Sequence, residues 1–220
     1  AGVKQLGSIE GDYKGVRQGT GVADNRYSTH SQTTITTGSK IIVMSAAEVW
    51  FLRAEAALRG YTSEDVENCY KQGITVSFSQ WDANGVSDYL ESEETPAAYV
   101  DAFDKKFDAD APTSITPKWD ESATPEQKLE RIITQKWLAL YPEGCEAWAE
   151  QRRTGYPQLI KVAVNNSGNT ISTDDMIRRV FFNQDYKTDN KALYDALVGK
   201  LGGADNGGTR LWWDTGRNNF

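Results

Sequence analysis

The apolar positions of residues 45–81 recur at helical spacing, which predicts two helices folded back on each other. Ser45 suits the N-cap of the first helix, and Glu48 three residues later would complete a capping box. Gly60 stands where a left-handed C-terminal residue would end this helix. The side of the first helix that we expect to be buried carries Val49, Leu52, Ala56, Ala57 and Leu58.

The second helix is predicted to open at Thr62 and to pack closely on the first, because small residues alternate with bulky ones. Its inner side carries Val66, Tyr70, Gly73 and Ile74. The bulky and small positions of a tetratricopeptide repeat match Trp50, Ala54, Val66, Tyr70 and Gly73. One such unit cannot bury its hydrophobic face alone, and the sequence offers no second copy. The pair should therefore pack either on the rest of this chain or on repeats elsewhere.

The remaining pattern predicts further helices separated by long polar loops. These helices cover residues 95–103, 124–140, 143–153 and 190–201. Thr124 and Gln127 form a capping box for the second of them. Its buried stripe carries Leu129, Ile132, Ile133, Lys136, Trp137 and Leu140, with the lysine at the margin.

Two short apolar runs, at residues 159–164 and 176–182, predict a small β-hairpin whose strands are joined across the turn at 165–168. The chain is therefore predicted to be mainly α, with a tetratricopeptide-like helix pair and a loop-rich region that includes this hairpin. Its expected parts are a loop-rich segment at 1–43, the helix pair at 44–81 and an α-rich region with the hairpin at 82–220.

Composition adds several limits to this picture. The 220 residues carry 39% hydrophobic residues and a net charge of −7, which argues against a nucleic-acid surface and a polybasic membrane patch. The longest apolar runs are far shorter than the roughly 20 residues of a membrane span. Cys69 and Cys145 both fall in predicted helices, and we expect two buried free thiols. The chain opens in a polar loop without Met, so a fragment or processed chain is expected.

Candidate catalytic and metal chemistry is sparse. The single histidine, His30, and the lack of a Gly-x-Ser-x-Gly motif disfavour a serine triad, and two cysteines cannot complete a zinc site. The turn at 82–88 lacks the final glutamate of a calcium loop. Glu143, Glu146 and Glu150 are interpreted as a solvated helix face rather than a catalytic pair. We therefore expect no catalytic residues, no metal and no cofactor.

The seven tryptophans have different expected roles. Trp50, Trp137 and Trp148 lie on apolar helix faces and should belong to the core. Trp212 and Trp213 follow a glycine-rich turn and should dock the C-terminus. Trp81 and Trp119 stand beside Asp82 and Asp120 at helix ends or in polar loops. They could pack or contact a ligand, since sugar sites combine aromatic faces with polar groups.

Motifs spread over nearly the whole chain, in order, resemble the SusD/RagB family. In the first half they are Ser45-Ala-Ala-Glu48, Arg53-Ala-Glu55, Arg59-Gly60, Tyr70-x-x-Gly73-Ile74 and Ser77-Phe78. In the second half they are Lys118-Trp-Asp-Glu121, Glu130 to Lys136, Tyr141-Pro142, Glu146-Ala-Trp148, Arg152 to Pro157, Ile177-Arg-Arg179, Gly202 to Gly208 and Trp212-Trp-Asp214. None is specific alone, but together they identify the chain as similar to the C-terminal part of a family member.

The resemblance implies a non-enzymatic lipoprotein on the surface of the outer membrane of Bacteroidetes. Such a protein captures oligo- or polysaccharides, or in some cases peptides, for import through a partner TonB-dependent transporter of the SusC type. The other repeats would precede Ala1, and the N-terminal lipid anchor of the family is absent from this chain.

For ligand binding, the resemblance singles out the segment before the repeat, with Tyr13, Arg17, Asn25 and Tyr27, and Trp81 as a further candidate. Arg17 would offer a rigid hydrogen-bonding fork and the tyrosines stacking faces. Two other functional classes stay open, an α-rich glycoside hydrolase and a tetratricopeptide-type protein-interaction scaffold. Product release from a polysaccharide would favour the first, and a flat surface without aromatic platforms would favour the second.

Overall fold

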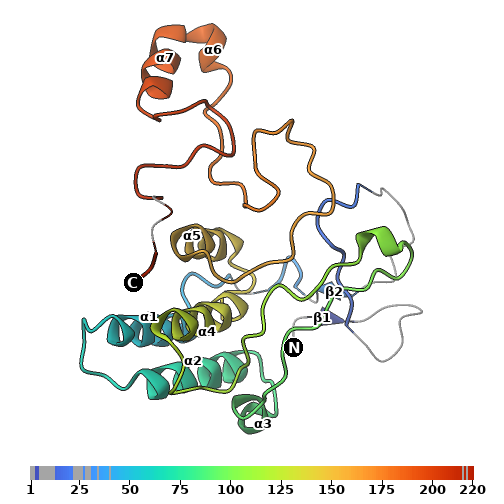
Figure 1. The fold of residues 1–220 in the computed structure, drawn as a ribbon, viewed down its shortest axis with the longest axis vertical. Coiled ribbons are helices and arrows are strands. Elements are labelled where there is room, and N and C mark those ends of the chain that lie inside the picture. Colours follow the sequence, from blue (N-terminus) through green and yellow to red (C-terminus); the bar gives the residue numbers. More distant parts are fainter. Residues whose placement is uncertain are drawn as a thin grey trace. The chain divides into compact units, whose positions relative to one another are not determined.

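The computed structural model describes residues 3–4, 13–21, 27, 31–33, 35–39, 41–214, 216 and 218–220. The chain divides into two compact units (Figure 1). The first comprises Ala1–Arg17, Val22–Ile160 and Phe220, and the second Gln18–Gly21 and Lys161–Asn219. The mainly α class predicted from the sequence is confirmed.

The helices α1 and α2 of the first unit pack on each other, and α4 packs on both of them. The elements are α1 (Ala46–Leu58), α2 (Val66–Gln80), α3 (Val86–Leu90), η2 (Lys105–Phe107), α4 (Pro125–Ala139) and α5 (Gly144–Thr154). Ser45 caps α1 by accepting a hydrogen bond from the backbone N–H of Glu48, and Thr124 with Gln127 forms the full capping box of α4. Gly60 is left-handed, with φ of 74°, as a helix stop requires.

The core lies where α1 and α2 pack on α4. Its fully buried side chains include Phe51, Tyr70, Leu129, Ile132 and Ile133. Tyr70 also lies 5.1 Å, between ring centroids, from Trp119, which is buried and therefore packs in the core. The helix pair thus buries its apolar side on this chain's own helices, which decides between the two arrangements that the sequence allowed.

The structure corrects two details of the first pair. Val49 and Leu52 are partly exposed, and Ala47, Phe51 and Ala54 are buried instead, so the inner face of α1 is rotated from the predicted one. Both faces carry apolar residues at helical spacing, and only packing against α2 and α4 selects one. The helix α2 begins at Val66 rather than near Thr62, because the Asp65 carboxylate caps it by accepting from the Asn68 N–H.

Residues 95–103 are not helical. Tyr99 and Ala109 pair as an isolated antiparallel bridge, with N–H···O distances of 2.8 and 2.9 Å. The Asp101 carboxylate accepts from the backbone N–H groups of Phe103 and Asp104, each at 2.9 Å. These side-chain bonds offer the backbone an alternative to helix, which explains the wrong prediction.

The strands lie elsewhere than predicted. In the described residues, β1 (Val3–Lys4) pairs antiparallel with β2 (Gln32–Thr33), and Val3 lies opposite Thr33. Residues 159–164 and 176–182 form no strands or hairpin. The backbone N–H groups of Ala163 and Val164 instead donate to the carbonyls of Gln18 and Gly19, a distant segment that periodicity cannot identify.

The second unit contains α6 (Tyr186–Asp189) and α7 (Lys191–Gly199), and buried ion pairs organise the rest of it. Arg178 Nε donates to Asp214 at 2.7 Å, and Arg179 Nη1 donates to Asp205 at 2.6 Å. The predicted aromatic anchor is wrong for Trp212, whose surface is 89% exposed. Asp214 secures the C-terminal segment in its place.

Both cysteines are free thiols, as predicted, but only Cys69 is buried and Cys145 is exposed. Burial raises the pKa of the Cys69 thiol above its ordinary value. Among the described residues, the structure has no helix with the length and apolar character needed to cross a membrane.

Candidate ligand-binding site

An aromatic groove opens on the first unit where α2, α4 and the start of α5 meet. Its cavity volume is about 410 Å³, and its lining is mostly apolar. The aromatic groove is defined by Ser77, Phe78, Trp81, Ala83, Trp137, Leu138, Leu140, Tyr141, Pro142, Glu143, Gly144 and Ala147. Such a concave, aromatic-lined surface suits the apolar face of a sugar ring.

Helix ends present the rings of this groove. Trp81 is the residue that ends α2, and Asp82 follows it in a left-handed conformation, with φ of 51°. Tyr141 follows α4, where a cis bond to Pro142 turns the chain into α5. The rings of Trp81 and Tyr141 lie 6.0 Å apart between centroids at 49°, so the two sides of the groove meet at this pair.

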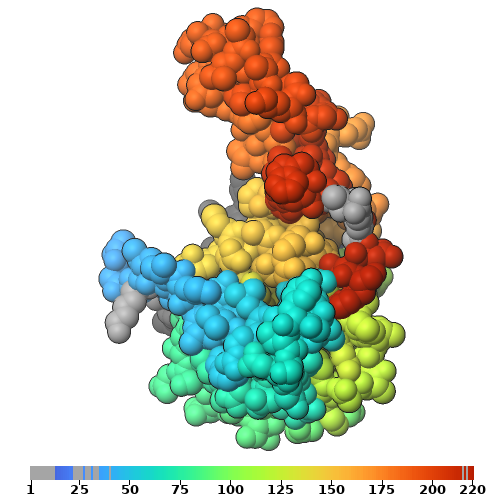
Figure 2. Space-filling view, turned by 90° about the vertical axis from the view of Figure 1, so that its left-hand side faces the viewer, coloured from blue at the N-terminus to red at the C-terminus, as the bar shows by residue number. Residues whose placement is uncertain are grey.

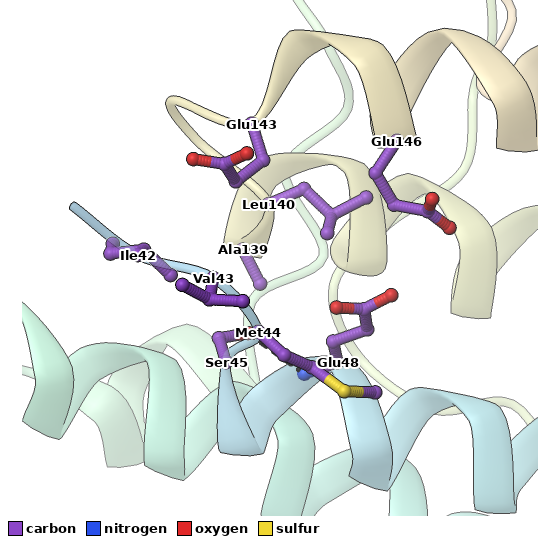
Figure 3. A pocket seen from close by; sticks show the side chains of 9 residues that line it. All are labelled: Ile42, Val43, Met44, Ser45, Glu48, Ala139, Leu140, Glu143 and Glu146. Carbon is purple, nitrogen blue, oxygen red and sulfur yellow. Dashed lines mark hydrogen bonds between the residues drawn. The ribbon is translucent and has the colours of Figure 1, made fainter.

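A second cavity, the acidic notch, shares two lining residues, Leu140 and Glu143, with the groove. Figure 3 shows the side chains that line the notch. The notch has a volume of about 300 Å³ and is lined by Ile42, Val43, Met44, Ser45, Glu48, Ala139, Leu140, Glu143 and Glu146. The carboxylates of Glu48 and Glu146 point toward each other across it. In the space-filling view the blue residues near the start of α1 lie beside the yellow surface of α5 (Figure 2).

Lys136 lies behind the acidic notch and is 1% exposed, so the prediction that it lies at the margin of the stripe is wrong. Its Nζ is 3.6 Å from Glu48, 3.7 Å from Glu146 and 3.4 Å from Glu150. The three carboxylates compensate the buried ammonium, which would otherwise be costly. Burial raises the pKa of Glu48, and Lys136 opposes this shift without cancelling it.

Glu150 also belongs to a buried network, so the solvated face predicted for it is wrong. Arg153 donates to both Glu55 and Glu150, with distances of 2.6–3.0 Å, and this bond set joins α1 to α5. Arg59 adds a bond of 2.8 Å to Glu55. Burial alone would raise the pKa of Glu55, but the hydrogen bonds from both arginines outweigh it and lower the pKa.

The predicted ligand residues fall in two places in the first unit. Arg17 Nη1 donates to the carbonyls of Phe107 and Asp108 at 3.0 and 2.9 Å. Tyr27 donates its hydroxyl to Asp101 at 3.0 Å and meets the Phe103 ring edge-on at 5.2 Å. Both therefore converge on residues 99–108.

Of the other predicted residues, Tyr13 is 71% exposed, and Trp81 lies in the aromatic groove. Asn25 lies outside the described residues. Sequence reasoning missed the second half of the groove. The sequence predicts Trp137 to lie in the core, whereas it lines the groove. Trp137 and Tyr141 are four residues apart, and this helical spacing is the signal that places both side chains on one face.

Other tryptophans predicted to be core are only half-buried. The guanidinium of Arg53 stacks 3.8 Å from the centre of the Trp50 ring, and that of Arg152 lies 3.7 Å from Trp148. Across the described part of the chain, no three His, Cys, Asp or Glu side chains are grouped to hold a metal ion. The Asp82–Gly85 turn serves instead to start α3, with Gly85 at φ of 84°.

Comparisons with a family model and with solved structures indicate the same family. Residues 3–214 match the family model described as SusD and RagB outer membrane lipoprotein. A chitin-binding SusD homologue from Flavobacterium johnsoniae is 42% identical, with a TM-score of 0.93 over 99% of this chain and 46% of that one.

Two further solved structures agree. A SusD homologue from Bacteroides vulgatus is 48% identical, with a TM-score of 0.91 over 100% of this chain and 46% of that chain. A SusD homologue from Bacteroides thetaiotaomicron is 35% identical, with a TM-score of 0.90 over 99% of this chain and 48% of that chain. The chain thus spans about half the length of these relatives. A search of curated proteins returned no match.

Proposed function

We propose, from the premise that this chain belongs to the SusD/RagB family of outer membrane lipoproteins, that it binds a glycan at the bacterial surface for import. The observation that carries the proposal is the aromatic groove, whose Trp81 and Tyr141 rings offer stacking faces at the surface of the first unit. The chitin-binding relative, which is 42% identical, supports a carbohydrate as the ligand class.

The mechanism is binding rather than chemistry. A sugar ring stacks on the groove aromatics, and its hydroxyls hydrogen-bond to polar groups at the rim. The protein then passes the glycan to a TonB-dependent transporter of the SusC type. In the full-length protein, a lipid anchor at the N-terminus would hold it to the outer membrane. The transfer to a transporter and the lipid anchor are inferred from the family and are part of this proposal.

Calorimetric titration with chitin oligosaccharides and a panel of plant and host glycans tests the proposal. Trp81→Ala should weaken binding of the active glycan about fivefold or more, since a stacked aromatic ring supplies about 1–3 kcal/mol. Trp212→Ala is the matched control, because this tryptophan is exposed and lies in the second unit. No binding of any glycan, or equal loss in both variants, would contradict the proposal.

The predicted loop residues are tested in the same titration. Tyr13→Ala and Arg17→Ala should weaken binding if the loop contributes to the ligand face, and unchanged affinity would remove the loop from the site. For transport, the full-length protein is purified from detergent-solubilised outer membranes. Co-purification of a large transporter supports the import role.

The hydrolase alternative has a direct assay. The facing carboxylates Glu48 and Glu146 both lie within 3.7 Å of Lys136 Nζ, which pairs them with a cation rather than with a substrate. We therefore expect no release of reducing sugar from any polysaccharide that binds. A protein-interaction scaffold would be expected to present a flat surface without aromatic platforms. The hollowed, aromatic-lined groove therefore favours glycan binding over the scaffold alternative.

A further inference from the structure

The aromatic groove and the acidic notch are continuous in their lining. Leu140 and Glu143 border both cavities. A ligand that stacks on the groove aromatics would therefore place its neighbouring groups near Glu143 and, further on, near the notch. The chemistry of this junction decides which substituents on a glycan are favourable.

Among the residues that the structure describes, the charged ones that line the two cavities are all glutamates, namely Glu48, Glu143 and Glu146. Lys136 belongs to neither lining, and it is shared among Glu48, Glu146 and Glu150. Its ammonium forms ion pairs at 3.4–3.7 Å with these three carboxylates but makes no hydrogen bond within the described part of the chain, and one cation cannot neutralise three acids. The lining therefore carries excess negative charge.

Glu143 differs from the other two glutamates. It occupies the N-cap position of α5, yet its side chain caps no backbone N–H group. Within the residues that the structure describes, no ion pair or hydrogen bond engages its carboxylate. The helix dipole favours an acid at this position but supplies no counter-ion. A half-buried carboxylate without a cation, next to the Tyr141 ring, is complementary to a positively charged ligand group.

We propose that this site selects glycans with free amino groups, such as oligomers of β-linked glucosamine, over their neutral N-acetylated counterparts. The inference rests on the proposed glycan-binding function and names the substrate class of the same site. The pyranose ring stacks on Trp81 and Tyr141, and its ammonium group pairs with Glu143. A cation on an aromatic-lined surface also gains from the ring faces themselves.

The experiment compares two tetrasaccharides that differ only in N-acetylation, glucosamine tetramer and N-acetylglucosamine tetramer. Each is titrated calorimetrically at low salt against the wild-type protein, Glu143→Gln and Glu94→Gln. Glu94 is an exposed acid that lines neither cavity, so its variant carries the same change in net charge. A third variant, Trp81→Ala, reports on stacking.

We expect the wild-type protein and Glu94→Gln to bind the amine form roughly three- to fivefold more tightly, the size of a partly exposed ion pair. Glu143→Gln should abolish this preference. Raising the salt concentration should reduce the preference, because partly exposed charges are screened.

The outcomes separate the two proposals. Equal or tighter binding of the N-acetylated form, or a preference that survives in Glu143→Gln, overturns the amine selectivity and leaves glycan binding in place. Binding of neither tetramer overturns the selectivity, and the glycan panel then decides the wider function. Binding that is insensitive to Trp81→Ala places the ligand outside the groove, which overturns the amine selectivity of this site and leaves glycan binding in place.

Discussion

Gly73 of α2 lies against the ring of Phe51 of α1, so closely that a methyl group at Gly73 would lie 2.7 Å from two atoms of that ring. Phe51 is 1% exposed and is surrounded by the core, so its ring cannot move aside. The contact sets how closely the two helices approach and explains why the repeat pattern needs a small residue at this position.

Gly73→Ala should therefore destabilise the first unit. Overpacking of a filled core typically costs 1–3 kcal/mol, and the gain in helix propensity offsets up to about 1 kcal/mol of this. We expect a net loss of about 1–2 kcal/mol in the free energy of unfolding, measured by urea denaturation.

Gly199→Ala provides the matched control, because Gly199 ends α7 and has no atom within 4 Å of the added methyl group. It should be neutral or slightly stabilising. A Phe51→Leu, Gly73→Ala double variant should lose less than the sum of the single changes if the clash is the cause. Additive losses would show that the two residues do not compete for space.

Glu55→Gln tests the network that joins α1 to α5. The folded pKa of Glu55 lies below its ordinary value of 4.5, so its contribution is present above that pH and is lost as the pH falls through the folded pKa. We expect a loss of about 1–3 kcal/mol at pH 7, because charged hydrogen bonds from Arg153 and Arg59 are replaced by neutral ones.

The difference between wild type and Glu55→Gln should shrink below pH 4.5, in urea titrations at several pH values. Glu94→Gln, which changes an exposed acid, should stay within about 0.5 kcal/mol of wild type. A difference that grows toward acid pH would reverse the sign of the inferred linkage and contradict the network.

The C-terminal segment offers a contrast between a buried acid and an exposed tryptophan. Asp214→Asn removes the charge that pairs with Arg178, although Asp175 stays within 3.0 Å of that guanidinium. We expect a loss of about 2–4 kcal/mol for the second unit. Trp212→Ala should change its stability by less than about 0.5 kcal/mol. Near-ultraviolet circular dichroism on heating measures the stability of both variants. A larger loss of stability in Trp212→Ala than in Asp214→Asn would show that Trp212 anchors the C-terminal segment after all.

The two thiols should differ in reactivity. Cys145 is exposed and should react rapidly with a disulfide reagent, whereas Cys69 is buried and its pKa is raised, so little thiolate is available. We expect one equivalent of rapid reaction in the native protein and a second on unfolding in urea. In Cys145→Ser the rapid phase should disappear, and its persistence would show that Cys69 is accessible.

The helix pairs illustrate what can be predicted from sequence alone. Ser45 as an N-cap, Thr124 with Gln127 as a capping box and Gly60 as a helix stop act through their own backbone neighbours, and the structure confirms each one. The same holds for the small residue at Gly73, since the repeat pattern records the close approach of two neighbouring helices. Local chemistry and short-range packing therefore carried these predictions.

The arrangement of the candidate site could be established only from the tertiary structure. Trp81 and Tyr141 are 60 positions apart in the chain and meet only because α2 and α4 end side by side. Lys136 reads as a marginal residue because helical periodicity cannot reveal that three glutamates from two other helices surround its ammonium. Residues 159–164 and 176–182 read as strands, but strand pairing requires a partner that folding did not supply.

The sequence by itself thus determined the helical class, most helix ends and the family, because capping groups, glycines and ordered motifs act locally. Tertiary structure alone decided which face of α1 is buried, where the carboxylates find cations and which aromatics share a groove. Each of these depends on residues that are distant along the chain, and their energies arise only when packing brings the groups together and excludes water from between them.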